Sequence, residues 1–246
     1  MRIHLAGMGS ALKKQQDVAG EAIYALESFY YWQDWETRFL SVWKGFLLDS
    51  GAFTFMMKGA VGAEFRAYVD RFVDFIKANG IQYYFEMDVD SVLGYDEVRR
   101  LRRDIENRTG RPSIPVWHIS RGIADLKATC KDYSYIAIGQ NVNAKGQYCD
   151  LTREQQRRII DIAHENGALI HGLGRTSQEA LQSGFDSIDS TTWLNGVKYN
   201  SIQAYRNGKI RHLTGVGRKT ILTSDQKLAM NLRAWVKMQQ YAEKYL

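Results

Sequence analysis

The stretch Phe46-Leu47-Leu48-Asp49-Ser50-Gly51-Ala52-Phe53 decides how the rest of the chain is interpreted. A short apolar run ends in a carboxylate, a hydroxyl and a glycine, which predicts a buried strand with an aspartate at its carboxyl-terminal tip. Two later stretches end in the same way, Tyr83-Tyr84-Phe85-Glu86-Met87-Asp88 and Phe185-Asp186-Ser187-Ile188-Asp189. We therefore expect the three aspartates that close these runs to surround one pocket: Asp49, Asp88 and Asp189.

Around this stretch, apolar runs of strand length alternate with segments of helical periodicity. The predicted strands are residues 3–6, 46–49, 81–88, 115–119, 135–139, 168–172 and 186–189, with 209–213 as the candidate eighth. The predicted helices are residues 17–35, 63–79, 95–107, 152–166, 177–183 and 223–245. This alternation predicts an α/β protein with a parallel sheet, and about eight such units predict a closed (β/α)8 barrel of the TIM type. An open doubly wound sheet is the alternative.

The bulk composition fits one domain with a substantial core. The chain has 246 residues, of which 45% are hydrophobic and 24% charged. We expect a single catalytic barrel over residues 1–246, with a hairpin and a C-terminal helix at about 197–246 as its closing part. No signal peptide and no apolar run of about 18 residues is present, so we expect a cytoplasmic protein, in the host cytoplasm if it is viral, with no membrane partner. Cys130 and Cys149 are interpreted as free thiols in a reducing compartment, with a disulfide between them as the alternative.

The chain carries a mild excess of positive charge, +6. This excess suits a polyanionic partner without proving one. A basic C-terminal region either tracks phosphates or is a scattered solvated surface. It comprises Lys198, Arg206, Lys209, Arg211, Arg218 and Lys219. A second basic run, on the predicted helix 95–107, is expected to be a solvated outer face. It contains Arg99, Arg100, Arg102 and Arg103.

The predicted fold brings the strand-end residues together. In a parallel barrel all strand carboxyl ends share one face, and active sites lie there. Each aspartate alone would be consistent with a helix cap, but three at one barrel mouth suit nucleophilic attack on a glycosidic carbon and proton transfer. The five histidines lack HxH or HExxH spacing, so no metal site is predicted. His118 and His171 lie on predicted strands, each either as a packed side chain or as a pocket residue.

Five short motifs, in order, resemble the tRNA-guanine transglycosylases, the queuine and archaeosine enzymes. Residues 49–53 resemble the DSGG(F/Y)Q motif of that family, and residues 85–88 resemble its strand that ends in a base-binding aspartate. Residues 136–139 resemble its AIGG strand, 171–174 its GVG turn, and 184–189 the G(I/V)DMFD segment that carries the nucleophile. The resemblance covers about residues 45–195. It implies a barrel enzyme, a pentosyltransferase that exchanges a purine base without a cofactor.

The resemblance also assigns roles to individual residues. Asp189 matches the nucleophile that attacks the ribosyl C1′ and holds a covalent intermediate. Asp49 matches the general base for the incoming 7-deazaguanine, and Asp88 the carboxylate that grips the base edge. Phe53 would stack on one face of the base and His171 would cover the other. The remaining substrate-binding positions are Ser50, Gly51, His118, Gly139, Gln140 and Gly172.

The departures from the family pattern bear on the substrate. No cysteine follows Cys149, so the family's zinc subdomain is expected to be missing. Gln140 replaces a glycine of the base-contacting pair, and Thr54 replaces the glutamine after the stacking aromatic residue. A short chain without zinc resembles the DNA branch of the superfamily, which occurs in phages and bacterial modification islands. We therefore expect insertion of a 7-deazaguanine, such as 7-cyano-7-deazaguanine, into DNA rather than tRNA.

Three points stay open at this stage. A duplex substrate could require an accessory protein that opens the strands. A nucleoside or glycoside hydrolase on the same barrel is the alternative enzyme. A barrel that binds nucleic acid without catalysis is the alternative from another class of protein.

Overall fold

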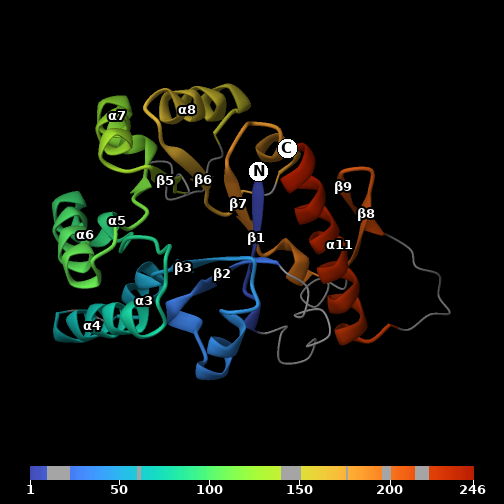
Figure 1. The fold of residues 1–246 in the computed structure, drawn as a ribbon, viewed down its shortest axis with the longest axis horizontal. Helices are drawn as coiled ribbons and strands as arrows, with labels where there is room; N and C mark the ends of the chain where they lie inside the picture. Colours follow the sequence, from blue (N-terminus) through green and yellow to red (C-terminus); the bar gives the residue numbers. More distant parts are fainter. Residues whose placement is uncertain (10–22, 60–61, 140–150, 176, 196–200, 214–221) are drawn as a thin grey trace.

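Seven parallel strands form one curved sheet (Figure 1) in the order β3-β2-β1-β7-β6-β5-β4. The computed structural model describes residues 1–9, 23–59, 62–139, 151–175, 177–195, 201–213 and 222–246. The strands of the sheet are β1 (Arg2–Ala6), β2 (Tyr24–Ser28), β3 (Gly45–Asp49), β4 (Val116–Trp117), β5 (Tyr135–Ile138), β6 (Leu169–Gly172) and β7 (Ser187–Ser190).

Two isolated parallel bridges close this sheet into a ring. Leu48 of β3 pairs with Tyr84, and Phe85 pairs with Ile114 just before β4. The Phe85 N–H donates to the Leu48 carbonyl at 2.9 Å, and the Glu86 N–H donates to the Ile114 carbonyl at 3.1 Å. Residues 84 and 85 therefore occupy an eighth position between β3 and β4. The fold is the single (β/α)8 barrel that the sequence predicts.

The predicted helix over residues 17–35 is wrong in its described part. Residues 24–28 form β2, which pairs in parallel with β1 and β3. The five residues from Ile23 to Glu27 are all buried, as a strand covered on both faces requires. Two short 3-10 turns follow, η1 (Phe29–Tyr31) and η2 (Asp34–Phe39). Pairing with two neighbouring strands overrides the helical spacing of the apolar residues in this segment.

The predicted eighth strand, residues 209–213, does not belong to the ring. It is β9 (Lys209–Leu213), which pairs antiparallel with β8 (Ile202–Arg206) in a separate two-stranded sheet. The expected turn at Asn207-Gly208 is confirmed, because both residues have positive φ angles, 51° and 72°. The place beside β1 is taken by β7, which pairs with it from Arg2 to Leu5.

The helices lie outside the strands (Figure 1) and bury their apolar faces against them. Thr152 is confirmed as an N-cap, since its side chain accepts from the Gln155 N–H and completes a capping box. Two further 3-10 turns are η3 (Ile119–Arg121) and η4 (Thr192–Leu194). The helices are α3 (Ala52–Met57), α4 (Ala63–Ala78), α5 (Asp90–Leu93), α6 (Tyr95–Thr109), α7 (Gly122–Asp132), α8 (Arg153–Glu165), α9 (Gln178–Leu181) and α11 (Ser224–Tyr245).

The basic helix α6 is only partly an outer face. Arg99 and Arg100 are exposed, as expected. Arg102 is buried, and its Nε donates to Glu86 Oε2 at 2.6 Å across a barrel wall. The run therefore contains a structural ion pair, because a buried guanidinium requires a partner of opposite charge. None of the helices in the described part of the chain has the length and apolarity needed to cross a bilayer.

Helix α11 fastens the C-terminal region to the first strands of the barrel. Gln239 Nε2 donates to the Ile3 carbonyl at 2.6 Å and to the Tyr24 carbonyl at 2.8 Å. The amino group of Met1 lies 3.4 Å from the Ala242 carbonyl. In Figure 1 the red helix accordingly runs alongside the blue N-terminal strand.

Asn231 of α11 holds the hairpin and η4 together, so Asn231→Leu is expected to destabilise the protein. The fully buried Asn231 accepts from the Gln203 N–H at 2.7 Å and donates to the carbonyls of Trp193 and Ser201. Leucine has a similar size but leaves these groups unpaired. The free energy of unfolding in urea should fall by about 2–3 kcal/mol. The exposed control Lys237→Leu should change it by less than about 0.5 kcal/mol. Equal values for the two variants would contradict this role.

Candidate active site

A large cavity opens at the carboxyl-terminal ends of the strands. Its volume is about 1490 Å³, and segments that follow several different strands line it. The lining includes Asp49, Asp88 and Asp189, so the predicted convergence of these three side chains is confirmed. They share one rim because parallel strands of a barrel all end on the same face.

Asp189 is the most enclosed of the three carboxylates. It lies on β7 with 7% of its surface exposed. Its Oδ1 accepts from the Gly174 N–H at 2.7 Å and lies 3.2 Å from His171 Nε2. Among the residues that the structure describes, none forms a hydrogen bond with Oδ2. One carboxylate oxygen is thus held by the protein, and the other meets no donor in this part of the chain.

Asp49 ends β3 and lies beside a tight turn. Its Oδ2 accepts from the Gly51 N–H at 3.1 Å. Burial raises the pKa of Asp49 to about 6, and the negative charges of Asp189 and Asp88 add to this, although hydrogen bonds from Ser28 and Gly51 oppose it. Gly51 has a φ of +63°, and a Cβ there would lie 2.5 Å from Ser28 Oγ. The turn that follows the strand therefore needs glycine.

Asp88 and His118 form a pair on another side of the cavity. Asp88 Oδ1 lies 2.8 Å from His118 Nε2. Burial lowers the pKa of His118, but the hydrogen bond and the charge of Asp88 outweigh it, so that the pKa is raised. Gly139 packs under this ring, because a Cβ at that position would lie 2.3 Å from His118 Cε1. A side chain at residue 139 would displace the histidine.

The Asp88–His118 pair gives a direct titration test. Asp88→Asn should lower the pKa of His118, because the hydrogen bond and the charge of Asp88 are lost, whereas burial and the charge of Arg121 remain and are opposed by the charge of Asp90. Histidine ring signals followed by NMR across pH would measure this change. The exposed Asp96→Asn variant serves as the control. An unshifted titration of His118 in Asp88→Asn would contradict the pairing.

One group of described residues has the donor atoms for a metal ion. Asp88, Asp90 and His118 place one ligand atom each within 4.8 Å of one another. Carboxylates and imidazole suit several divalent metals. However, Asp90 Oδ2 accepts from Arg121 Nη2 at 2.8 Å, and Asp88 is paired with His118. These contacts satisfy the group within the protein, and we assign no metal to it.

Of the other site residues predicted from the sequence, some line the cavity and some do not. Phe53 lines the cavity and is 46% exposed, as a stacking residue would be. The prediction that His171 covers the base is wrong, because its ring is fully buried in the barrel interior below Asp189 and does not line the cavity. Ser50 and Gly51 lie beneath the rim rather than on the cavity wall. Gly172 is turned away, since a Cβ there would contact Arg175 and Phe185. Gln140 lies outside the described residues.

Two carboxyl groups that line the cavity, Glu27 and Glu36, were not predicted from the sequence. Glu27, on β2, is 4% exposed and accepts from the Gly9 N–H at 3.0 Å. Burial raises the pKa of Glu27 to about 8, with a further contribution from the charge of Glu36, whose own pKa burial raises to about 7. Glu27 could have been found from the segment Tyr24-Ala25-Leu26-Glu27-Ser28, an apolar run that ends in a carboxylate and a hydroxyl. It was missed because this segment was predicted to be helical.

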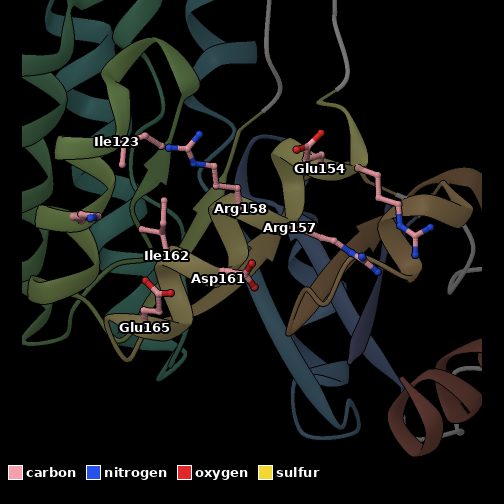
Figure 2. Close-up of a pocket in the computed structure, with 9 residues that line it drawn as sticks. Ile123, Glu154, Arg157, Arg158, Asp161, Ile162 and Glu165 are labelled. Atoms are coloured by element: carbon pink, nitrogen blue, oxygen red, sulfur yellow. The ribbon is translucent and has the colours of Figure 1, made fainter.

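A second hollow lies outside the barrel, between α7 and α8 (Figure 2). Its volume is about 700 Å³, and its labelled residues include Arg157, Arg158, Asp161 and Glu165. These are side chains of both signs on an outer helical surface, away from the carboxyl ends of the strands. The cavity at the barrel mouth, with its convergent carboxylates, is therefore the candidate active site.

Comparison with known proteins supports the fold alone. No family model matches the chain, and no curated protein matches it. A structure described as a fructose-1,6-biphosphate aldolase from Coccidioides immitis has a TM-score of 0.53 and 12% identity, covering 99% of this chain and 87% of that one. A structure entitled native KDPGal has a TM-score of 0.50 and 14% identity, covering 98% of this chain and 95% of that one. At such low identity, the likeness concerns the barrel.

Proposed function

We propose that this protein is a base-exchange transglycosylase, which replaces guanine in a polynucleotide by a 7-deazaguanine through a covalent glycosyl–aspartate intermediate. The observation that carries the proposal is the cavity in which three strand-end aspartates meet beside an exposed aromatic ring. These four residues, Asp49, Asp88, Asp189 and Phe53, are among those to which the resemblance assigns roles. DNA is favoured over tRNA, because the chain lacks the cysteines of a zinc subdomain.

Asp189 is suited to be the nucleophile. An ionised carboxylate attacks C1′ of the target nucleotide, a bond forms from C1′ to the carboxylate oxygen, and the bond from C1′ to guanine N9 breaks. With Oδ1 held by the Gly174 N–H, Oδ2 is the atom left to attack. Guanine leaves with the bonding electrons and takes up a proton. Asp189 holds C1′ of the sugar as a glycosyl ester until the second base arrives.

Asp49 is suited to move the proton in the second half of the reaction. The incoming base must lose its N9 proton as it attacks C1′ and releases Asp189. Proton transfer is most effective when the pKa of the group is near the working pH, and the pKa of Asp49 is about 6. Asp88, oriented by His118, would accept N–H groups of the base edge, and Phe53 would stack on its face.

The size of the cavity favours a nucleotide of a polymer over a free small molecule. At about 1490 Å³ it exceeds the range of roughly 300–1000 Å³ that drug-sized ligands usually occupy. A base that reacts at its glycosidic bond must leave the stack and enter such a pocket. Basic side chains on the β8–β9 hairpin, Arg206, Lys209 and Arg211, also line a hollow of about 590 Å³ and could contact phosphates.

The test is base exchange with radiolabelled guanine. Purified protein is mixed with single-stranded DNA, with duplex DNA and, separately, with unmodified tRNA, and label in each polymer is counted. We expect label in DNA, and label in single strands but not in duplex would indicate that an accessory protein opens the strands. Label in tRNA alone would support the reaction but reverse the choice of polymer.

Two outcomes would favour the alternatives. Release of free guanine from DNA without any acceptor base would indicate a hydrolase on the same barrel, with water in place of the incoming base. Salt-sensitive binding of DNA without label entry or base release would indicate a barrel that only binds nucleic acid. Either result would overturn the proposed exchange.

A further inference from the structure

A chain of hydrogen bonds crosses the barrel interior below Asp189. Tyr135 Oη lies 2.5 Å from Ser187 Oγ, which lies 2.6 Å from His171 Nδ1. His171 Nε2 in turn lies 3.2 Å from Asp189 Oδ1. Tyr135 begins β5 and Ser187 begins β7, whereas Asp189 lies near the carboxyl end of β7. The chain therefore runs from the amino-terminal side of the barrel up to the floor of the cavity.

One arrangement of hydrogen atoms connects the two ends of this chain. Burial raises the pKa of Tyr135 to about 12, so its hydroxyl keeps its proton and can donate to Ser187. At the other end, an ionised Asp189 can only accept. Ser187 then donates to His171 Nδ1, and His171 donates from Nε2–H to Asp189. In this arrangement the imidazole has a bare Nδ1 and carries a proton on Nε2.

The surroundings of His171 protect this arrangement from water. The His171 ring is fully buried. Its centroid lies 5.3 Å from that of the Phe85 ring and 5.9 Å from that of the His4 ring. His4 adds no positive charge, because burial lowers its pKa to about 3, and its Nδ1 lies 3.1 Å from the Ala25 carbonyl. In a dry interior, no solvent molecule can replace a lost donor, so each bond of the chain counts for more than it would at the surface.

We propose that His171 is a positioning residue for the nucleophile: through its Nε2–H it holds Asp189 Oδ1, with the Gly174 N–H as second donor, and so aims Oδ2 at the sugar carbon. This inference rests on the proposed transglycosylase function for its kinetic consequence. Its geometric content, the tautomer and the direction of the chain, stands on the contacts of the buried residues.

Kinetics of two substitutions separate positioning from packing. His171→Leu removes the donor and should lower kcat for guanine exchange by about 100-fold, the upper range for residues that orient a reacting group, with KM within about threefold. His171→Gln keeps an N–H near the Nε2 position and should stay within about 10-fold of the unmodified protein. The exposed control His212→Leu should leave all rates unchanged.

A second measurement does not depend on turnover. In ¹⁵N-histidine-labelled protein, the NMR signals of His171, identified by their loss in His171→Gln, should report a protonated Nε2 and a bare Nδ1. Ser187→Ala should weaken this preference, whereas Tyr83→Phe, at an exposed neighbour of Tyr135, should not. A proton on Nδ1 with a bare Nε2, or full activity of His171→Leu, would overturn the inference. If the unmodified protein exchanges no base, the proposed function fails, and the tautomer alone still decides the geometric claim.

Discussion

Asp189→Asn is expected to lower base exchange by at least about 10⁴-fold while leaving the fold intact, because the variant loses its nucleophile. The amide has nearly the shape of the carboxylate, and its oxygen can still accept from the Gly174 N–H. It cannot form the ester with C1′, so the covalent intermediate disappears rather than slows. Asp49→Asn should act differently, since it removes proton transfer from the second half of the reaction and lets the intermediate accumulate.

Covalent trapping measures this difference directly. The protein is incubated with labelled single-stranded DNA, denatured, and examined for label that migrates with the polypeptide. The unmodified protein should show an adduct, Asp189→Asn none, and Asp49→Asn more than the unmodified protein. Circular dichroism and the thermal unfolding midpoint control for the fold. A normal rate of guanine incorporation by Asp189→Asn would remove this residue from the mechanism.

The second large effect concerns stability and pH. Burial raises the pKa of Glu27 to about 8, whereas an unfolded glutamate has a pKa near 4.3. Between these values the folded chain binds a proton that the unfolded chain has released, so the free energy of unfolding falls as pH rises, by about 1.4 kcal/mol per pH unit. From pH 4.5 to above pH 8 the total loss is about 3–5 kcal/mol. Glu27→Gln, neutral at every pH, should recover most of it.

Urea unfolding at half-unit steps from pH 5 to pH 9 tests this expectation. At pH 8 the Glu27→Gln variant should be more stable than the unmodified protein by about 3–5 kcal/mol, and at pH 5 the difference should shrink to about 1 kcal/mol. A shallower slope should remain in the variant, because burial also raises the pKa of Glu36. Glu64→Gln, at an exposed position on α4, is the matched control. If the free energies of unfolding of Glu27→Gln and the unmodified protein changed with pH in parallel, the pKa of Glu27 in the folded protein would not be raised, and the expectation would be wrong.

The sequence predicted the barrel and its central carboxylates because both depend on a local pattern. An apolar run followed by Asp, as at Leu47-Leu48-Asp49, specifies a buried strand with a polar tip regardless of its partners. Parallel pairing then places all such tips on one face, whatever the order of the strands. For this reason Asp49, Asp88 and Asp189 could be grouped, although more than a hundred residues separate the first from the last.

The parts that were missed depend on contacts that no local pattern encodes. The spacing of apolar residues in 23–30 fits a helix, and only pairing with β1 and β3 makes residues 24–28 a strand. Because this strand was not predicted, Glu27 near its carboxyl end was not predicted as a cavity residue. The local sequence Ile170-His171-Gly172 is compatible with a histidine that lines the cavity and with one that is buried in the barrel interior. The interior position of His171 follows from its contacts with Ser187 and Asp189 on the neighbouring strand. Inside a closed barrel, the direction of a side chain depends on its contacts with neighbouring strands, which the local sequence does not specify.

The attachment of α11 to β1 has a consequence for how the protein is made. Gln239 bonds to Ile3 across 236 residues of sequence, so β1 lacks its outer cover until those residues have been synthesised. At about 5–20 residues per second, a ribosome needs roughly 12–48 s to reach that point. During this interval the apolar outer side of β1 is exposed on the nascent chain. Chaperones that bind nascent apolar segments are therefore expected to engage β1 and to release it only after residues 224–245 leave the exit tunnel.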